Sequence, residues 1–281
     1  MAGWAGTPTT RACDHAAVAA TGDGRREVRS GAQSVERALA VLRCFEQADR
    51  SLGVSGIAAT TGLSVSTAHR LTRALCAGGL LMQDPRSERY LLGPVLVVLG
   101  RRAEDQLGYA RALPALESLA DATGESVNLG IRSGAEVLVV LAVPSRQPLR
   151  FDQLAGSRVP IHTSAMGKCL LAFAAPEPAG TDAVSELPRL SRFTDRTITR
   201  RDQLVAELER TRARGWALND EERNPGVRAV AAPVLGGSGS AIAAVAVQGP
   251  AMRLPNDRLV TVAGQVVEAT EAVGPVLRSP S

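Results

Sequence analysis

One segment, residues 64–77, constrains the fold of this chain more than any other because its two sides have opposite chemistry. Its apolar stripe follows the i, i+3, i+4, i+7 spacing of an α-helix and consists of Ala68, Leu71, Thr72 and Leu75. Its polar side has the same kind of spacing and consists of Ser66, His69, Arg70 and Arg73. Ser64 is suited to cap the first turn, and two glycines follow the segment. The pattern predicts a helix that packs one side against its own domain and presents the other to solvent or to a partner.

Shorter elements surround this helix in an order that narrows the fold further. Helical spacing predicts one helix that begins at a Ser34 cap and a second at about residues 54–61. After the glycines, residues 80–83 and 89–92 have the composition of two short strands, joined by a turn-rich tip at residues 84–88. Three helices followed by a hairpin are the order of a winged helix-turn-helix, whose third helix enters the major groove of DNA.

The residue types on the polar side of the third helix suit the reading of DNA. Arginine binds guanine edges or phosphates, and small hydroxyl residues let the backbone approach the groove closely. Arg86 and Arg89 lie in the predicted hairpin, where they would touch the DNA backbone or the minor groove. The alternative is a protein-interaction module without DNA binding, whose arginines are only solvated. The residues that we predict to contact DNA are Arg37, Ser64, Ser66, Thr67, His69, Arg70, Arg73, Arg86 and Arg89.

Composition permits DNA binding and argues against several other kinds of site. The formal net charge is +4, and residues 1–100 hold 11 arginines and 8 acidic residues, against 21 basic and 20 acidic residues in the remainder. The cysteines form no Cys-x-x-Cys pair, so we expect reduced thiols without a disulfide or a zinc site. No apolar run approaches the about 20 residues of a membrane helix. We expect a cytoplasmic protein with no membrane contact and no cofactor.

The sequence pattern changes beyond residue 93. A linker helix is predicted at about residues 95–106 and another helix at about residues 110–123. A β-hairpin is then predicted from two alternating sets of apolar residues, namely Val127, Leu129 and Ile131, and Val137, Val139, Leu141 and Val143. The remaining predictions are an apolar helix that ends near residue 174, a helix at 200–214, strands at 216–219, 229–235 and 241–248, and a closing helix at 256–273. Strands flanked by helices indicate an α/β sensory domain.

Short strings along both halves of the chain resemble the IclR family of bacterial regulators. In the first half they are SVERAL (34–39), TGLS (61–64), STAHRL (66–71) and RYLLG (89–93). In the second half they are TGESVNL (123–129), GSRVPIH (156–162), GK (167–168), DEE (220–222), AAPV (231–234), and GP (249–250) with Arg253. Each string is weak alone, but their shared order and spacing are specific to the family.

The resemblance implies an α/β (α+β) chain with two domains. Residues 31–93 would form the winged helix-turn-helix, residues 94–108 the linker helix, and residues 109–275 a GAF/profilin-like effector-binding domain with an antiparallel sheet. We expect residues 1–30 to be a disordered tail or an over-extended start. The resemblance also implies homodimers, often paired into tetramers, on double-stranded operator DNA, with a small metabolite as effector. Repression is the expected effect, although the sequence itself does not distinguish repression from activation.

The family's effector pocket maps onto six positions of this chain. One wall is the start of a helix, where backbone amides suit an anionic group. Members that bind small acids such as glyoxylate or pyruvate carry an acid at position 219, a cysteine at 229, and serines at 246 and 248. This chain has Asn219, Ala229, Ala246 and Gln248 at those positions. These differences predict a roomier, less polar pocket and argue against a short keto acid as the effector. Asn219 and Gln248 would be the specific hydrogen-bonding groups of the pocket. The predicted effector-binding residues are Ala165, Met166, Asn219, Ala229, Ala246 and Gln248.

Two polar features close to these positions have competing interpretations. Lys168 could pair with an anionic effector, but we expect it to hydrogen-bond to His162 and brace the loop. The consecutive acids at residues 220–222 could be a catalytic or metal-binding cluster. We expect them to be a solvated turn, because consecutive carboxylates after a strand are more often exposed.

An enzyme is the alternative from another class, and the sequence gives it little support. Residues 236–240, GGSGS, lack the last glycine of a G-x-S-x-G elbow, and the GK string lacks the earlier glycine of a phosphate-binding loop. No two of the three histidines have metal-ligand spacing. A hydrolase based on His162 and Ser164 would need an orienting third group that we cannot name. We therefore expect no catalytic and no metal-binding residues.

Overall fold

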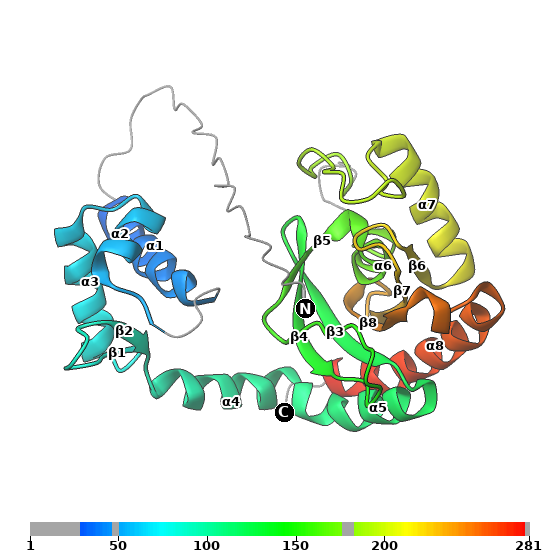
Figure 1. Cartoon of the computed structure of the whole chain (residues 1–281), viewed down its shortest axis with the longest axis horizontal. Helices are drawn as coiled ribbons and strands as arrows, with labels where there is room; N and C mark the ends of the chain where they lie inside the picture. The colour runs from blue at the N-terminus through cyan, green and yellow to red at the C-terminus, as the bar shows by residue number, and fades with distance from the viewer. Residues whose placement is uncertain (1–28, 47–50, 176–182, 279–281) are drawn as a thin grey trace, which may run out of the picture. The chain divides into compact units, whose positions relative to one another are not determined.

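The computed structural model describes residues 29–46, 51–175 and 183–278 and divides the chain into two compact units, Met1–Leu92 and Gly93–Ser281 (Figure 1). The predicted linker helix groups with the second unit. Residues 1–28 of the predicted tail lie outside the described residues, whereas Arg29 and Ser30 belong to the first helix. Among the described residues, no helix combines the length and the apolar character needed to cross a membrane.

The first unit has the predicted order of three helices and a hairpin. Its elements are α1 (Arg29–Arg43), the 3-10 helix η1 (Cys44–Glu46), α2 (Val54–Thr61), α3 (Val65–Ala77), β1 (Leu81–Gln83) and β2 (Tyr90–Leu92). The prediction of a cap at Ser34 is wrong, because α1 begins five residues earlier. Ala32 and Gln33 favour the helical conformation and extend the helix backwards. Leu52 pairs with Tyr90 of the hairpin through an isolated antiparallel β-bridge.

The core of the first unit explains which side of α3 faces outward. Ala68, Thr72 and Leu75 are buried, and Leu71 is half-buried, as the apolar stripe predicted. They pack with residues of the other elements, including Val41, Ile57, Leu81 and Tyr90. Burying this stripe removes apolar surface from water and leaves the polar side of α3 exposed.

The second unit is larger and contains all the remaining elements. They are α4 (Val95–Leu107), α5 (Tyr109–Thr123), β3 (Ser126–Ser133), β4 (Glu136–Val143), β5 (Arg158–Pro160), η2 (Ile161–Thr163), α6 (Ala165–Ala172), α7 (Arg201–Arg214), β6 (Ala217–Asp220), β7 (Val227–Leu235), β8 (Ala241–Pro250), η3 (Ala251–Arg253) and α8 (Asn256–Arg278). β5 and the 3-10 helices could not be predicted from the sequence, because three residues are too few to show a period. The predicted closing helix also ends five residues too early, since Val276 and Leu277 continue the apolar packing of α8.

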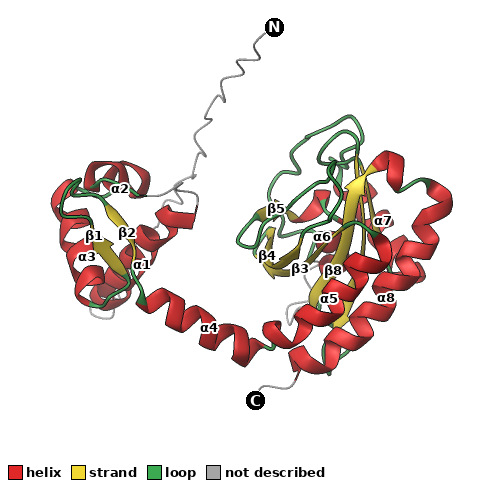
Figure 2. Ribbon diagram, turned by 60° about the horizontal axis from the view of Figure 1, so that its bottom comes forward, coloured by secondary structure: helices red, strands yellow, loops and turns green. Residues whose placement is uncertain are grey.

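A six-stranded antiparallel sheet, in the order β5-β4-β3-β8-β7-β6, forms the centre of this unit. Figure 2 shows α5 and α8 side by side across one face of the sheet, and α6 and α7 lie on the opposite face. Each face buries its own apolar cluster. The predicted α/β (α+β) fold with an antiparallel sheet is therefore confirmed.

A β-bulge in β4 corrects the predicted alternation of that strand. Leu129 of β3 pairs with Leu141, but the next residue, Gly130, pairs with Val139, so Val140 is an extra residue on β4. An extra residue reverses the alternation of a strand. Val137 and Val139 consequently face α6, whereas Leu141 and the residues beyond it in the same register face α5 and α8. The prediction that these valines and leucines alternate as one set is wrong.

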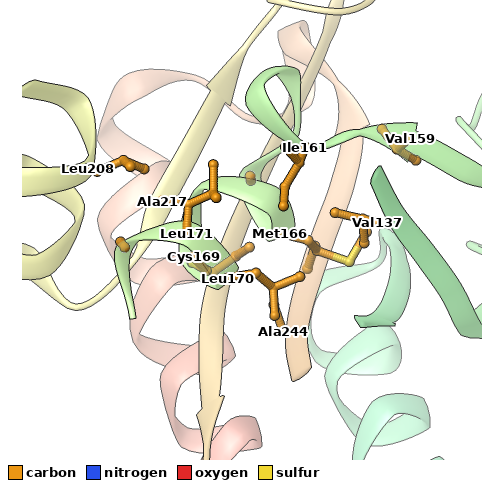
Figure 3. Close-up of a cluster of buried hydrophobic side chains, with 14 of the residues drawn as sticks. Val137, Val159, Ile161, Met166, Cys169, Leu170, Leu171, Leu208, Ala217 and Ala244 are labelled. Carbon is orange, nitrogen blue, oxygen red and sulfur yellow. The ribbon is translucent and has the colours of Figure 1, made fainter. Parts of the chain in front are cut away.

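The start of α6 approaches its neighbours so closely that it requires two glycines. A Cβ atom on Gly167 would lie 1.9 Å from the carbonyl oxygen of Ile161, so no larger residue fits there. A Cβ atom on Gly130 would lie 2.5 Å from Val137 and 2.9 Å from Met166. Figure 3 shows Ile161, Val137 and Met166 in the apolar cluster around α6. The close packing fixes the amino-terminal end of α6 against the sheet.

Candidate nucleic-acid interface and ligand pocket

The polar side of α3 is exposed, as its sequence predicted. Ser66, His69, Arg70 and Arg73 all belong to the solvent-accessible side of the helix. Within the described part of the chain, no hydrogen bond or ion pair holds the guanidinium group of Arg70 or Arg73. Both are therefore free to contact a partner. Arg37 of α1 is also exposed.

Hydroxyl groups at the start of α3 build the helix terminus. The Ser64 hydroxyl accepts a hydrogen bond from the Thr67 amide at 3.2 Å and donates to the Thr67 hydroxyl at 2.8 Å. The hydroxyl of Ser66 lies 3.1 Å from that of Ser64. These bonds satisfy part of the helix terminus and hold the first turn of α3 in place.

The hairpin arginines differ in what they contact. Arg86 lies in the turn, which Asp84 holds by accepting from the Arg86 amide at 3.0 Å and from the Ser87 hydroxyl at 2.6 Å. These bonds lower the pKa of Asp84. Arg89 instead donates to the hydroxyl and the carbonyl of Ser51, at 2.9 and 2.6 Å. This contact could not be predicted from local sequence, because Ser51 is 38 residues away.

All six residues predicted for the effector pocket line one cavity of the second unit. Its volume is about 20 Å³, which is room for roughly one water molecule. The expectation of a roomier pocket compares this chain with members that bind small acids, so it stays a prediction. Phe151, Gln153 and Arg223 line the cavity as well and occupy space beside the small alanines. The sequence pattern does not reveal these three residues. Phe151 and Gln153 lie in a connecting segment without periodic signals, and Arg223 adjoins the acids predicted to form a solvated turn.

Polar contacts join the walls of the cavity. Asn219 accepts from the Glu222 amide at 2.9 Å through its side-chain oxygen. Gln248 donates to the Asn128 side chain at 2.5 Å, and Asn128 donates to the Gln153 carbonyl at 2.9 Å. Asn219 and Gln248 each retain one side-chain amide atom without a hydrogen-bond partner among the described residues. Those atoms are available to a ligand.

The amino-terminal end of α6 forms another wall. Ser164 caps the helix by accepting from the Gly167 amide at 3.0 Å. The Ala165 and Met166 amides, at the first two helical positions, have no partner within the helix, as is usual at a helix start. Both residues line the cavity. Such amides, together with the helix dipole, favour a negative group.

A buried ion pair links α6 to the turn after β6. Lys168, the only lysine of the chain, is 1 % exposed and pairs with Glu222, which is 6 % exposed. The expected hydrogen bond from Lys168 to His162 is therefore wrong, and so is the expectation that Glu222 lies in a solvated turn. Asp220, in contrast, is partly exposed and bonds Arg196 at 2.7 Å. Burial raises the pKa of Glu222, and the charge of Lys168 opposes that rise.

The ion pair also covers the free edge of the sheet. Lys168 donates to the Leu218 carbonyl at 2.5 Å, and the Asp220 amide donates to the Glu222 carboxylate at 3.4 Å. Both backbone groups belong to β6, which among the strands of the described ranges pairs only with β7. The two side chains thus satisfy backbone groups that a further strand would otherwise bind. Because Lys168 belongs to α6 and the Glu222 amide bonds Asn219, the ion pair also holds together the two walls of the cavity that α6 and Asn219 form.

His162 makes a different contact from the one predicted and supplies a test by pH. Its Nε2 atom lies 3.0 Å from the Ser191 carbonyl, and burial lowers its pKa below the ordinary value of 6.5. The charge of Lys168 lowers this pKa further, while the Ser191 bond opposes the shift. Because this pKa is lowered in the folded protein, His162 takes up a proton in the unfolded chain at a higher pH than in the folded chain.

We expect the free energy of unfolding to fall as the pH decreases through the ordinary histidine pKa. Denaturant unfolding at about pH 7.5 and about pH 5.5 measures the change, with His162→Gln as the comparison. The variant should lose part of the decrease, since glutamine does not titrate. An identical pH dependence in both proteins would show that His162 makes no such contribution.

Comparison with known proteins decides the family. Residues 34–85 match the IclR helix-turn-helix domain, and residues 109–274 match the family described as bacterial transcriptional regulator IclR C-terminal. The second match alone covers more than half of the chain. The chain belongs to the IclR family. It is a transcriptional regulator of the IclR type with a helix-turn-helix domain.

Named relatives and solved structures of the IclR family agree with this assignment. The chain is 35 % identical over 244 residues to the HTH-type transcriptional regulator BhcR of Paracoccus denitrificans, covering 86 % of each chain. It is 41 % identical over 230 residues to the glycerol operon regulatory protein of Streptomyces griseus, covering 80 % of this chain and 87 % of that protein. An IclR-type regulator structure from Alicyclobacillus acidocaldarius matches with a TM-score of 0.78 and 27 % identity, over 87 % of this chain and 98 % of that one.

Proposed function

We propose that the chain binds operator DNA through the polar side of α3 and that a small molecule in the cavity of the second unit changes the operator affinity. The observation that carries the proposal is the unpaired state of Arg70 and Arg73 on a helix whose other side is buried. Free guanidinium groups on a rigid helix suit the edges of guanine. The proposed contacts also include the remaining predicted residues of α1, α3 and the hairpin.

Fluorescence anisotropy on the intergenic DNA upstream of the gene tests this proposal. Binding should resist scrambled competitor DNA and weaken as salt rises, because contacts to phosphates release counterions. A matched titration with the scrambled sequence as the labelled probe serves as the control. Equal affinity for the two DNAs would contradict sequence-specific binding.

The coupling between the two activities follows from linkage. An effector changes operator affinity only as far as it binds one DNA-binding arrangement better than another. A ligand that binds the cavity tightly and leaves operator affinity unchanged would contradict this part of the proposal. The cavity lies among α6, β6, β7 and β8, and α4 begins the same unit shortly after the last residue of the first unit, Leu92.

We propose further that the protein is a homodimer and that α4 belongs to the dimer interface. None of the residues of α4 is buried, and Val97, Val98 and Leu99 are 58, 57 and 52 % exposed. Contiguous exposed apolar side chains mark interaction sites. A second copy fits this surface, since a twofold pair of recognition helices reads a palindromic operator.

Val98→Glu should therefore shift the protein from dimer to monomer, because a charge in an apolar interface is costly to bury. Light scattering coupled to size exclusion measures the mass, and anisotropy measures the accompanying loss of operator affinity. Gln106→Glu, at the polar end of the same helix, is the matched control. A Val98→Glu protein of unchanged mass would remove α4 from the interface.

We also propose that the protein has no enzymatic activity. A hydrolase would need an activated nucleophile beside a base. The Ser164 hydroxyl caps α6, His162 bonds the Ser191 carbonyl, and burial raises the pKa of Cys169 to about 12. Turnover of simple ester, amide or phosphate substrates that disappears in His162→Ala would contradict this.

A further inference from the structure

The lining of the cavity carries one formal charge, which is positive. Arg223, in the turn between β6 and β7, contributes it, and no aspartate or glutamate of the described residues belongs to the lining. The neighbouring wall adds the amides at the start of α6, which favour negative groups. The electrostatic character of the cavity therefore comes from Arg223 and the helix terminus together.

Arg223 has no counter-charge in the described part of the chain. The turn that holds it is rich in acids, but each of the three has another partner. Asp220 bonds Arg196 and Arg228, Glu221 pairs with Arg196, and Glu222 pairs with Lys168. Arg223 itself is half-buried, and burial lowers its pKa. A guanidinium group that is removed from water without a partner is costly unless a ligand supplies the missing acceptors.

Neutral amides line the same cavity as this arginine. Asn219 and Gln248 line the cavity, each with one amide atom free of a partner, and Gln153 and Asn224 line it as well. These groups form hydrogen bonds without adding charge. The cavity therefore offers one cationic point and several neutral hydrogen-bonding points.

We infer that Arg223 determines the specificity of the effector site and selects an organic anion whose carboxylate or phosphate group pairs with its guanidinium. The inference rests on the proposed function, because it assigns the ligand class of the same cavity. The guanidinium donates two parallel hydrogen bonds to an oxyanion, and the neutral amides bind hydroxyl or carbonyl groups elsewhere on the ligand. A ligand without an ionised group leaves Arg223 unpaired and binds weakly.

The small volume of the cavity assigns Arg223 a second part in binding. A cavity of about 20 Å³ admits no organic molecule until lining side chains move. Arg223 is less buried than Asn219 or Gln248 and lies in a turn, so it is the side chain that meets the incoming anion.

Isothermal titration calorimetry with matched pairs of anion and neutral molecule tests the inference on the full-length protein. The pairs are glycerol 3-phosphate with glycerol, succinate with succinamide, and 4-hydroxybenzoate with 4-hydroxybenzamide, at constant ionic strength. Wild-type protein should bind at least one anion about tenfold or more tightly than its neutral partner. The phosphate and carboxylate pairs show which kind of oxyanion the site takes.

Arg223→Gln should remove this preference, and Arg223→Lys should retain part of it, because lysine keeps the charge but not the paired donors. Arg192→Gln is the control, since Arg192 is an exposed arginine of the same unit that faces Asp195. The inference is overturned if no anion binds wild type, if the neutral partners bind equally well, or if Arg223→Gln keeps the preference.

Operator anisotropy on the same proteins separates this inference from the proposed function. Arg223→Gln should bind operator DNA like wild type in the absence of ligand, because Arg223 lies in the second unit. Normal operator binding without any anion preference would overturn the role of Arg223 alone. Absent operator binding by the wild-type protein would overturn the proposed function instead.

Discussion

Replacement of Arg70 and Arg73 with alanine is expected to abolish sequence-specific operator binding while the protein stays folded. Both side chains are exposed, neither has a partner among the described residues, and both project from a helix whose buried side is unchanged by the substitutions. A base-specific contact contributes about 1–3 kcal/mol, which is roughly 5- to 150-fold in affinity per arginine. The double variant should therefore lose nearly all discrimination between operator and scrambled DNA.

Anisotropy titrations at several salt concentrations measure the loss and identify its kind. An arginine that reads a base should relax sequence preference, whereas one that binds a phosphate should reduce the salt slope by about one. Arg43→Ala is the control, because Arg43 is another exposed arginine of the same unit, at the end of α1. Circular dichroism establishes that each variant is folded. Unchanged operator affinity in the double variant would remove α3 as the recognition helix.

Loss of either partner of the Lys168–Glu222 pair should produce the largest decrease in stability of the second unit. Both side chains are more than nine-tenths buried, so Lys168→Met leaves a buried carboxylate without its counter-charge. Breaking a buried pair in this way costs about 3–5 kcal/mol. The Leu218 carbonyl at the edge of the sheet also loses its donor.

Denaturant unfolding of three variants measures this cost and distinguishes the contribution of the paired charges from that of the packing of the two side chains. Lys168→Met and Glu222→Gln should each lower the free energy of unfolding, and the double variant Lys168→Met/Glu222→Leu should recover a large part, since it leaves no buried charge. Arg200→Gln, which breaks the exposed pair of Arg200 with Asp202, should cause no measurable change. Wild-type stability of Lys168→Met would contradict a structural role for the pair.

The elements that could be predicted from the sequence are those with a repeated local signal. α3 has two stripes with helical spacing, a capping serine and a glycine stop, and its bounds and exposed side agree with the structure. The six pocket positions came from the family resemblance, and all of them line one cavity. In each case the information lies within a short window or an ordered series of short strings.

Features that depend on distant residues could not be predicted. Nothing near Val140 signals the bulge that reverses β4, because the bulge arises from pairing with β3. Lys168 pairs with Glu222, which is 54 residues away in the sequence, and Arg89 bonds Ser51, which is 38 residues away. Arg223 was overlooked for another reason: it adjoins an acidic run that reads as a solvated turn, and only the fold turns it toward the cavity.

Selection of bound sequences from a randomised pool of double-stranded DNA is the most direct test of the central claim, that this regulator reads DNA sequence through α3. The wild-type protein should enrich a palindromic motif, and a dimer predicts half-sites about 34–36 Å apart or a multiple of that distance. The Arg70→Ala/Arg73→Ala protein, selected in parallel, should enrich nothing. Enrichment of the same motif by both proteins, or no enrichment by the wild type, would show that α3 does not read the DNA sequence.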